Sequence, residues 1–268
     1  MKSRERFSIV KKMIDQPSGT LLVTGGGKRI GRAISLAMAK DGWRVAVHFN
    51  KSSAEANNVV DEITHAGGSG LAVQADLMDE DAVSSLIGDI SDKLSPVTAI
   101  INNASLFEED TVESVTRDSW DRHLAINLRA PFLLTQGLAK NLKKNQSGNI
   151  INILDQRVEN LTPYFTSYTL SKSALWTLTK TTAAALAPNI RVNAIGPGPT
   201  LPSIRQSKSQ FDKQVALTPL AVQVDLEEIC NTVRFILATG SMTGQLLSID
   251  SGQHLGWAQP GQSDNPGE

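Results

Sequence analysis

The sequence predicts a single α/β domain in which helices cover both faces of a seven-stranded parallel sheet. From Thr20 onward, short β-branched runs alternate with longer amphipathic segments, and this alternation is typical of parallel strands joined by crossover helices. Most of the short runs are apolar at consecutive positions, as expected for strands that are buried on both faces. No break in the pattern divides the 268 residues, and α/β folds of about 250 residues commonly form one unit.

Each predicted strand is one of these short apolar runs, in chain order. The seven strands are expected at residues 20–24, 44–49, 70–75, 99–102, 149–154, 190–195 and 246–249. Helical spacing of apolar residues, in several cases after a Ser, Thr or Asp cap, predicts helices near residues 30–41, 53–66, 79–93, 117–144, 163–187 and 226–238. In such doubly wound sheets a ligand binds beyond the carboxyl ends of the strands, so those ends hold the first candidate residues.

Charge and cysteine content exclude several classes of function. The chain has 26 Lys and Arg residues against 27 Asp and Glu residues, for a net charge of -1, so we expect no general electrostatic grip on nucleic acid or a membrane surface. Its one cysteine, Cys230, rules out an internal disulfide framework and a thiolate-rich metal site. Because Cys230 lies among Ile229, Val233 and Ile236 at helical spacing, we expect a buried apolar residue and no reactive thiol.

The two ends of the chain lie outside the predicted domain. Residues 1–18 are basic but lack the apolar run of a secretory signal, and no segment reaches the roughly 18 apolar residues that span a bilayer. We therefore expect a cytoplasmic protein with a mobile extension at 1–18, a domain at 19–257 and a disordered tail at 258–268. The weakly periodic segment 199–224 is expected to form a lid over the site.

A glycine-rich turn follows the first predicted strand. Four glycines fall within the seven positions from Gly25 to Gly31, and an amphipathic helix begins directly at Ile30. Such a turn lets the backbone approach a pyrophosphate, while the free N–H groups of the helix start face its negative charge. The arrangement is typical of a Rossmann-type dinucleotide site, with closure of a strand–helix corner as the alternative.

The end of the second predicted strand favours a phosphorylated dinucleotide. A site for the unphosphorylated cofactor places an acidic residue there to bind the ribose hydroxyls, whereas this chain has Asn50, Lys51 and Ser52 and no carboxylate. A lysine beside a hydroxyl suits a 2′-phosphate, and Arg29 adds a second cation. The sequence predicts NADP(H), although Lys51 alone has the alternative of being a solvated surface lysine.

Polar residues at the next two strand ends fit the same cofactor. Asp76, after the third strand, can accept a hydrogen bond from the adenine amino group, with capping of the helix near Asp79 as the alternative. Asn102 to Ser105, after the fourth strand, supply amides and small residues where a dinucleotide would cross the sheet.

Tyr168 and Lys172 provide the candidate acid chemistry. They are spaced i, i+4 in a predicted helix, so they lie on one face and can contact one ligand. A lysine ammonium near the phenol favours the phenolate and lowers the phenol pKa from about 10 toward neutrality. The tyrosine then becomes a usable proton donor at physiological pH.

These motifs, together with Asn127 and Pro197-Gly198, occur in an order and spacing that resemble the short-chain dehydrogenase/reductases over about residues 18–257. The resemblance implies that Tyr168 is the catalytic acid, that Lys172 binds the nicotinamide ribose, and that Asn127 supports a proton-relay water. It also implies a homotetramer built on the helices near 117–144 and 163–187. The resulting set of cofactor-binding residues is Gly25, Arg29, Ile30, Gly31, Asn50, Lys51, Ser52, Asp76, Leu77, Asn103, Ala104, Ser105, Lys172, Pro197 and Gly198.

Two departures from the common family pattern narrow the resemblance. The chain has Arg29 where the family usually has glycine, and Asp155 where it usually has serine, thirteen residues before Tyr168. In both respects it resembles the pteridine reductases and dihydromonapterin reductases, whose Asn-Asn-Ala-Ser-x-Phe pattern is matched up to Phe107. An ionised aspartate would oppose the negative charge that develops on a ketone oxygen, whereas a carboxyl group linked to tyrosine can help to protonate a ring nitrogen.

The sequence thus predicts an NADPH-dependent reductase of a pterin-like substrate, with hydride transfer to a ring C=N bond and protonation through Tyr168 and Asp155. Predicted substrate contacts are Arg29, Phe107, Asp155 and Tyr168, with Phe107 stacking on the flat ring or, alternatively, belonging to the core. Two alternatives stay open: a ketone reductase of the same family, acting on a 3-oxoacyl or sugar substrate, and a non-catalytic NADP-sensing protein.

Overall fold

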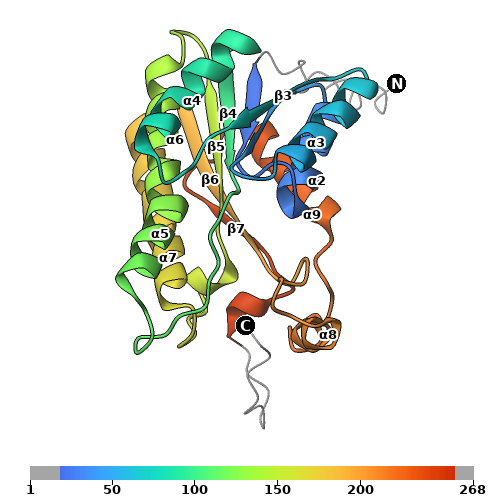
Figure 1. The fold of residues 1–268 in the computed structure, drawn as a ribbon, viewed down its shortest axis with the longest axis vertical. Coiled ribbons are helices and arrows are strands. Elements are labelled where there is room, and N and C mark those ends of the chain that lie inside the picture. The colour runs from blue at the N-terminus through green and yellow to red at the C-terminus, as the bar shows by residue number, and fades with distance from the viewer. Residues whose placement is uncertain (1–18, 257–268) are drawn as a thin grey trace, which may run out of the picture.

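Seven parallel strands form one sheet in the order β3-β2-β1-β4-β5-β6-β7 (Figure 1). The structure is a computed structural model that describes residues 19–256. Its strands are β1 Thr20–Val23, β2 Arg44–Phe49, β3 Ser69–Gln74, β4 Val97–Asn102, β5 Gly148–Ile153, β6 Ile190–Pro197 and β7 Leu246–Ile249. The order reverses between β1 and β4, so the carboxyl ends of these two strands form the switch point at which such sheets bind ligands. The predicted fold class is confirmed.

Helices pack on both faces of the sheet (Figure 1). One face carries α2 Arg29–Lys40, α3 Ser53–His65 and α9 Leu226–Ala238, and the other carries α4 Glu80–Lys93, α5 Arg117–Leu124, α6 Ala130–Asn141 and α7 Thr166–Leu186. Neighbouring residues of one strand serve both layers, because Leu21 packs into the first core and Leu22 into the second. This explains why the strands are apolar at consecutive positions.

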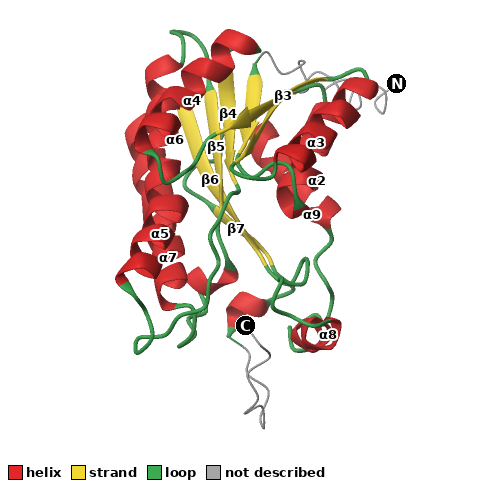
Figure 2. Cartoon of the chain, viewed as in Figure 1, coloured by secondary structure: helices red, strands yellow, loops and turns green. Residues whose placement is uncertain are grey.

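Three elements differ from the predicted helices. The helix expected at 117–144 is divided by a π-helical turn, Ala125–Arg129, between α5 and α6. The helix expected from 163 begins at Thr166, because Phe165 has φ 58°, in the left-handed region. The predicted lid contains a further helix, α8 Lys208–Ala216, which begins with a capping box of Ser207 and Gln210. Figure 2 shows α8 beyond the end of the sheet, apart from both helical layers.

Two short 3₁₀ turns follow strands of the sheet. The 3₁₀ turns are η2 Gln156–Val158, after β5, and η3 Gln253–Leu255, after β7. The predicted extension at 1–18 and the tail at 258–268 lie outside the described residues. Within 19–256, none of the helices has the length and apolar character needed to cross a membrane.

Candidate active site

Two cavities at the carboxyl ends of the strands hold most of the predicted site residues. The first, of about 410 Å³, is lined by the predicted cofactor residues Gly25, Arg29, Ile30, Asn50, Ser52, Asp76, Leu77, Asn103, Ala104 and Ser105. The second, of about 100 Å³, is lined by Asp155, Pro197 and Gly198 among others, and shares Arg29 and Ile30 with the first. The shared residues make the two cavities adjacent, so together they form a track from the end of β2 to the end of β6.

The glycine-rich turn is held by Asn103. Its side-chain Nδ2 donates to the carbonyl oxygen of Thr24 at 2.8 Å, and its backbone N–H donates to Thr24 Oγ1 at 2.9 Å. Gly25 has φ 61°, where glycine is favoured. A Cβ added at Gly31 would lie 2.2 Å from the carbonyl oxygen of Gly25 and 2.6 Å from Asn103 Nδ2. Gly31 therefore lets α2 approach the turn, while the Asn103 amide fixes the turn's shape.

His48, at the carboxyl end of β2, also fixes this turn and was not predicted. Its Nδ1 accepts from the backbone N–H of Gly25 at 3.2 Å, and its Nε2 lies 3.1 Å from the carbonyl oxygen of Ala75. Burial lowers the pKa of His48 from 6.5 to about 4. The neutral ring with the proton on Nε2 satisfies both contacts, so His48 ties the turn to β2 and to the end of β3.

The cavity wall near α3 contains Lys28 where the sequence suggested Lys51. Among the described residues, Asn50, Ser52 and Lys28 line the first cavity, and Lys51 does not. Lys28 Nζ lies 2.7 Å from Glu55 Oε1, with both side chains about half exposed. Lys28 is thus a second lysine within reach of the predicted 2′-phosphate position, and the sequence analysis missed it because Lys28 precedes Arg29 in a different loop.

Asp76 does not cap helix α4, which was the alternative to its predicted role in cofactor binding. The N-cap of α4 is Asp79, whose side chain accepts from the N–H groups of Asp81 and Ala82. Asp76 Oδ1 accepts from the N–H of Met78 at 3.0 Å and lines the first cavity. The alternative, that Asp76 caps this helix, is wrong.

Three of the four predicted catalytic residues meet beside the second cavity: Asp155 lines it, whereas Tyr168 and Lys172 line neither of the two cavities. The Tyr168 hydroxyl donates to Asp155 Oδ2 at 2.9 Å, and Lys172 Nζ lies 5.7 Å from the centroid of the Tyr168 ring. Lys172 Nζ donates to the carbonyl oxygen of Ile153 at 2.8 Å. Complete burial lowers the pKa of Lys172 from 10.5 to about 8, although the negative charge of Asp155 acts to raise it. The cluster therefore contains a carboxylate, a phenol and an ammonium that titrates near physiological pH.

Asn127 lies in the π-helical turn, and its side chain is fully engaged. Its Nδ2 donates to the carbonyl oxygen of Leu106 at 2.9 Å and to Ser171 Oγ at 3.0 Å, and its Oδ1 accepts from the N–H of Leu106 at 2.8 Å. These bonds explain how an amide is buried in an apolar helix. They anchor the chain that leads to Phe107, and the relay role implied for Asn127 stays a prediction.

The start of α7, which carries Tyr168, is fixed by a buried polar cluster that the sequence analysis missed. Asp110 Oδ1 accepts from the N–H of Ser167 at 3.0 Å, and Asp110 Oδ2 accepts from Ser167 Oγ. His123 Nδ1 lies 2.8 Å from Ser167 Oγ. Burial acts to raise the pKa of Asp110, but the hydrogen bonds from Ser167 and Ser119 outweigh it, and the pKa is lowered. An ionised Asp110 therefore caps the first turn of α7 in place of Phe165.

Phe107 lies beside Tyr168 and packs on two aromatic rings. Its ring centroid is 4.5 Å from that of Phe165, in a stacked arrangement, and 4.7 Å from that of Tyr168, edge to face. The guanidinium of Arg205, from the predicted lid, lies 4.8 Å from the Phe107 centroid and donates to its carbonyl oxygen at 2.9 Å. A second guanidinium, that of Arg157, lies 5.5 Å from the same centroid. Phe107 is thus half-buried beside Tyr168, and it lines neither of the two cavities.

Arg29 has a strained backbone and contacts the predicted lid. Its φ is 52°, in the left-handed region that favours glycine, and glycine is the residue that the family pattern has here. Its guanidinium donates to the carbonyl oxygens of Pro202 at 2.8 Å and Leu201 at 3.1 Å. Strained non-glycine residues are concentrated at functional sites, and here the strain accompanies a direct link between the glycine-rich turn and the lid.

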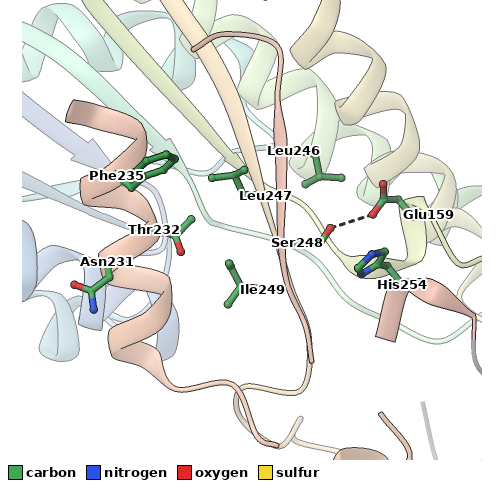
Figure 3. Close-up of a pocket in the computed structure, with 9 residues that line it drawn as sticks. All are labelled: Glu159, Asn231, Thr232, Phe235, Leu246, Leu247, Ser248, Ile249 and His254. Carbon is green, nitrogen blue, oxygen red and sulfur yellow. Dashed lines mark hydrogen bonds between the residues drawn. The ribbon is translucent and has the colours of Figure 1, made fainter. Parts of the chain in front are cut away.

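Other cavities contain none of the predicted site residues. One of about 600 Å³ lies between α9 and the edge strand β7, where Phe235 and Leu247 point into it and Ser248 bonds to Glu159 (Figure 3). Another, of about 730 Å³, lies near Trp43, at the opposite end of β2. Most of the predicted site residues therefore line the two adjacent cavities.

The fold and this cluster define a dinucleotide-binding oxidoreductase. The model of the short chain dehydrogenase family matches residues 19–213, and the chain belongs to that family. A curated relative, the 3-oxoacyl-[acyl-carrier-protein] reductase of Synechocystis, is 33% identical over 86% of this chain and 95% of its own. The predicted family is confirmed.

Two solved structures are more similar in sequence. FolM Alternative dihydrofolate reductase 1 from Brucella suis, in complex with NADP, is 47% identical with a TM-score of 0.88, covering 91% of this chain and 98% of its own. The protein of the same name from Brucella canis, also with NADP, is 44% identical with a TM-score of 0.86, over 92% and 98%. The presence of NADP in both is consistent with the cofactor predicted from the sequence.

Proposed function

We propose that the protein is an NADPH-dependent reductase of a pterin-like substrate, a dihydropterin, dihydromonapterin or dihydrofolate, and that it delivers hydride to a ring C=N bond. The observation that carries the proposal is the hydrogen bond from the Tyr168 hydroxyl to Asp155. It couples the family's proton donor to a carboxylate where the common pattern has serine. The Brucella proteins named as alternative dihydrofolate reductases support the same chemistry.

The track formed by the two cavities fits an extended dinucleotide. The glycine-rich turn is open at Gly25, Ser52 offers a hydroxyl, and Asp76 offers an acceptor for the adenine amino group. Lys28 would exchange its ion pair with Glu55 for the 2′-phosphate, with Lys51 as the second nearby cation. NADPH bound along this track would supply the hydride. The chain's own contribution is to bind and orient the cofactor so that the nicotinamide reaches Pro197 and Gly198.

Reduction of a ring C=N bond places hydride on carbon and requires a proton on nitrogen. Tyr168 would donate that proton and become a phenolate beside Asp155, and a proton taken up from solvent and relayed by Asp155 would restore the phenol. The substrate nitrogen, once protonated, carries no negative charge. Reduction of a ketone would instead develop an oxyanion there, which an ionised Asp155 opposes.

The substrate ring would lie between the nicotinamide and Phe107, with Arg29 at its polar edge. Segment 199–224 would act as the lid, because Arg29 and Arg205 tie it to the turn and to Phe107. We further propose a cytoplasmic homotetramer that packs through α5, α6 and α7, which sedimentation velocity would test by a single species of four times the chain mass.

A ketone reductase remains the second candidate, because curated relatives are 3-oxoacyl-[acyl-carrier-protein] reductases. A non-catalytic NADP sensor is disfavoured by the assembled Tyr168 and Asp155 pair. The experiment is NADPH oxidation, followed by absorbance, with dihydropterins, dihydrofolate, a quinonoid pterin and several ketones. Turnover of pterins alone supports the proposal. Turnover of ketones alone overturns it, and tight NADPH binding without any turnover would favour the sensor.

A further inference from the structure

The catalytic carboxylate has a buried counter-ion that takes no part in the chemistry proposed above. Arg157 lies two residues after Asp155, in η2, and its side chain is 6% exposed, against 17% for Asp155. Its backbone N–H donates to Asp155 Oδ1 at 2.8 Å, and its guanidinium NH1 lies 3.5 Å from both carboxylate oxygens. The carboxylate is therefore held on one side by Arg157 and on the other by the Tyr168 hydroxyl.

Aromatic rings fix the guanidinium in place. It lies 5.1 Å from the centroid of Phe165 and 5.5 Å from that of Phe107, beside the stacked pair. Its Nε is buried and has no hydrogen-bond partner among the described residues. Burial of a charged group with an unpartnered N–H destabilises a fold unless the charge itself is compensated. In this structure the compensating charge is that of Asp155.

We propose that Arg157 is a positioning residue that neutralises Asp155 and thereby sets the proton affinity of Tyr168. With Arg157 present, the Tyr168 phenol faces a carboxylate whose negative charge is balanced. Without it, the same carboxylate would oppose a second negative charge on the phenolate 2.9 Å away. Arg157 thus allows Tyr168 to act as an acid although Asp155 replaces the neutral serine that the family usually has.

Several other charged or titratable groups lie on the elements around this pair. They are Lys172 and Tyr168 on α7, His123 on α5 with its ring centroid 6.3 Å from that of Tyr168, Arg29 at the start of α2, Arg205 in the predicted lid, Glu159 after η2, and Asp250 with His254 at η3. Lys172 is fully buried, has a pKa lowered to about 8 and is retained in every variant considered below, so above that pH the charges that distinguish the variants are those of Arg157 and Asp155. Arg29 and Arg205 are exposed, and water screens their charges. Arg157 is the one buried arginine among them.

The chain offers a direct test, because its two tyrosines are Tyr164 and Tyr168. In a Tyr164→Phe background, phenolate absorbance in the near ultraviolet reports Tyr168 alone and needs no substrate. Four proteins are titrated in this background: the parent, Arg157→Met, Asp155→Asn and the double variant. Local charge predicts the order of the midpoints: lowest for Asp155→Asn, close to the parent for the double variant, and highest for Arg157→Met, by about one pH unit or more above the parent.

Equal midpoints in all four proteins would overturn the inference, since a merely structural role for Arg157 changes stability without ordering the titrations by charge. Arg157→Lys keeps the charge and should titrate like the parent. If Arg157→Met does not fold, as judged by circular dichroism, an unchanged midpoint in Asp155→Asn alone refutes the proposal. The inference rests on the proposed function only for the role of Tyr168. The titration needs no substrate, so its failure would refute the role of Arg157 and leave the proposed function to the turnover assay.

Discussion

Replacement of Arg29 tests whether its strained backbone serves the lid. With φ at 52°, a residue that has a Cβ destabilises the fold by roughly 1–2 kcal/mol relative to glycine. Glycine in turn destabilises the fold by about 0.4–1 kcal/mol relative to alanine, because it makes the unfolded chain more flexible. Arg29→Gly and Arg29→Ala both remove the hydrogen bonds to Leu201 and Pro202. Arg29→Gly should therefore be the more stable of the two, by roughly 0.5–1 kcal/mol.

Urea unfolding of the two variants measures this difference directly, because the lost side-chain contacts are nearly the same in both. Both variants should also be cleaved faster within segment 199–224 during limited proteolysis, since the lid loses its link to the turn. An Arg29→Ala variant as stable as Arg29→Gly would refute the reasoning about strain. Unchanged proteolysis of the segment would refute the reasoning about the lid.

Lys172, His48 and Ser167 are buried polar residues whose replacement has measurable consequences. Because the pKa of Lys172 is lowered to about 8, the unfolded chain binds its proton more tightly, so the free energy of unfolding should rise between pH 8 and 10.5 in the wild type and less in Lys172→Met. Because the pKa of His48 is lowered to about 4, stability and NADPH affinity should fall as the pH decreases from 6.5 toward 4, and His48→Gln should weaken this dependence in fluorescence titrations of NADPH. Ser167→Ala, which removes a hydroxyl between Asp110 and His123, should cost about 1 kcal/mol in urea unfolding and lower kcat without changing NADPH affinity.

The sheet was predictable because its physical signal is local. Most strands are apolar at consecutive positions, and all seven predicted strands overlap the observed ones. The glycine-rich turn was predictable from the four glycines between Gly25 and Gly31, although His48 and Asn103 also fix its shape. The π-helical turn at Asn127 was not predictable, because it depends on hydrogen bonds to Leu106 and Ser171, which lie far away in the sequence.

The site was predictable only where a motif fixes the spacing. Tyr168, Lys172 and Asp155 meet as expected, because helix geometry and the end of β5 place them. Arg157 and Lys28 were missed because their roles depend on which side of a loop faces the cavity. Arg157 had one sequence signal, a cation two residues after the carboxylate, but only its burial beside the stacked aromatic rings and next to Asp155 identifies it as a counter-ion.

The most direct test of the account is the specificity of Asp155→Ser. We would compare kcat/KM for a dihydropterin and for a 3-oxoacyl thioester, with NADPH, in the wild type and in this variant. The account predicts that the wild type favours the pterin and that the variant loses at least about 100-fold on it, as expected when a proton relay is removed, without a comparable loss on the ketone. A wild type inert toward pterins, with ketone turnover maintained or improved by the serine, would contradict it.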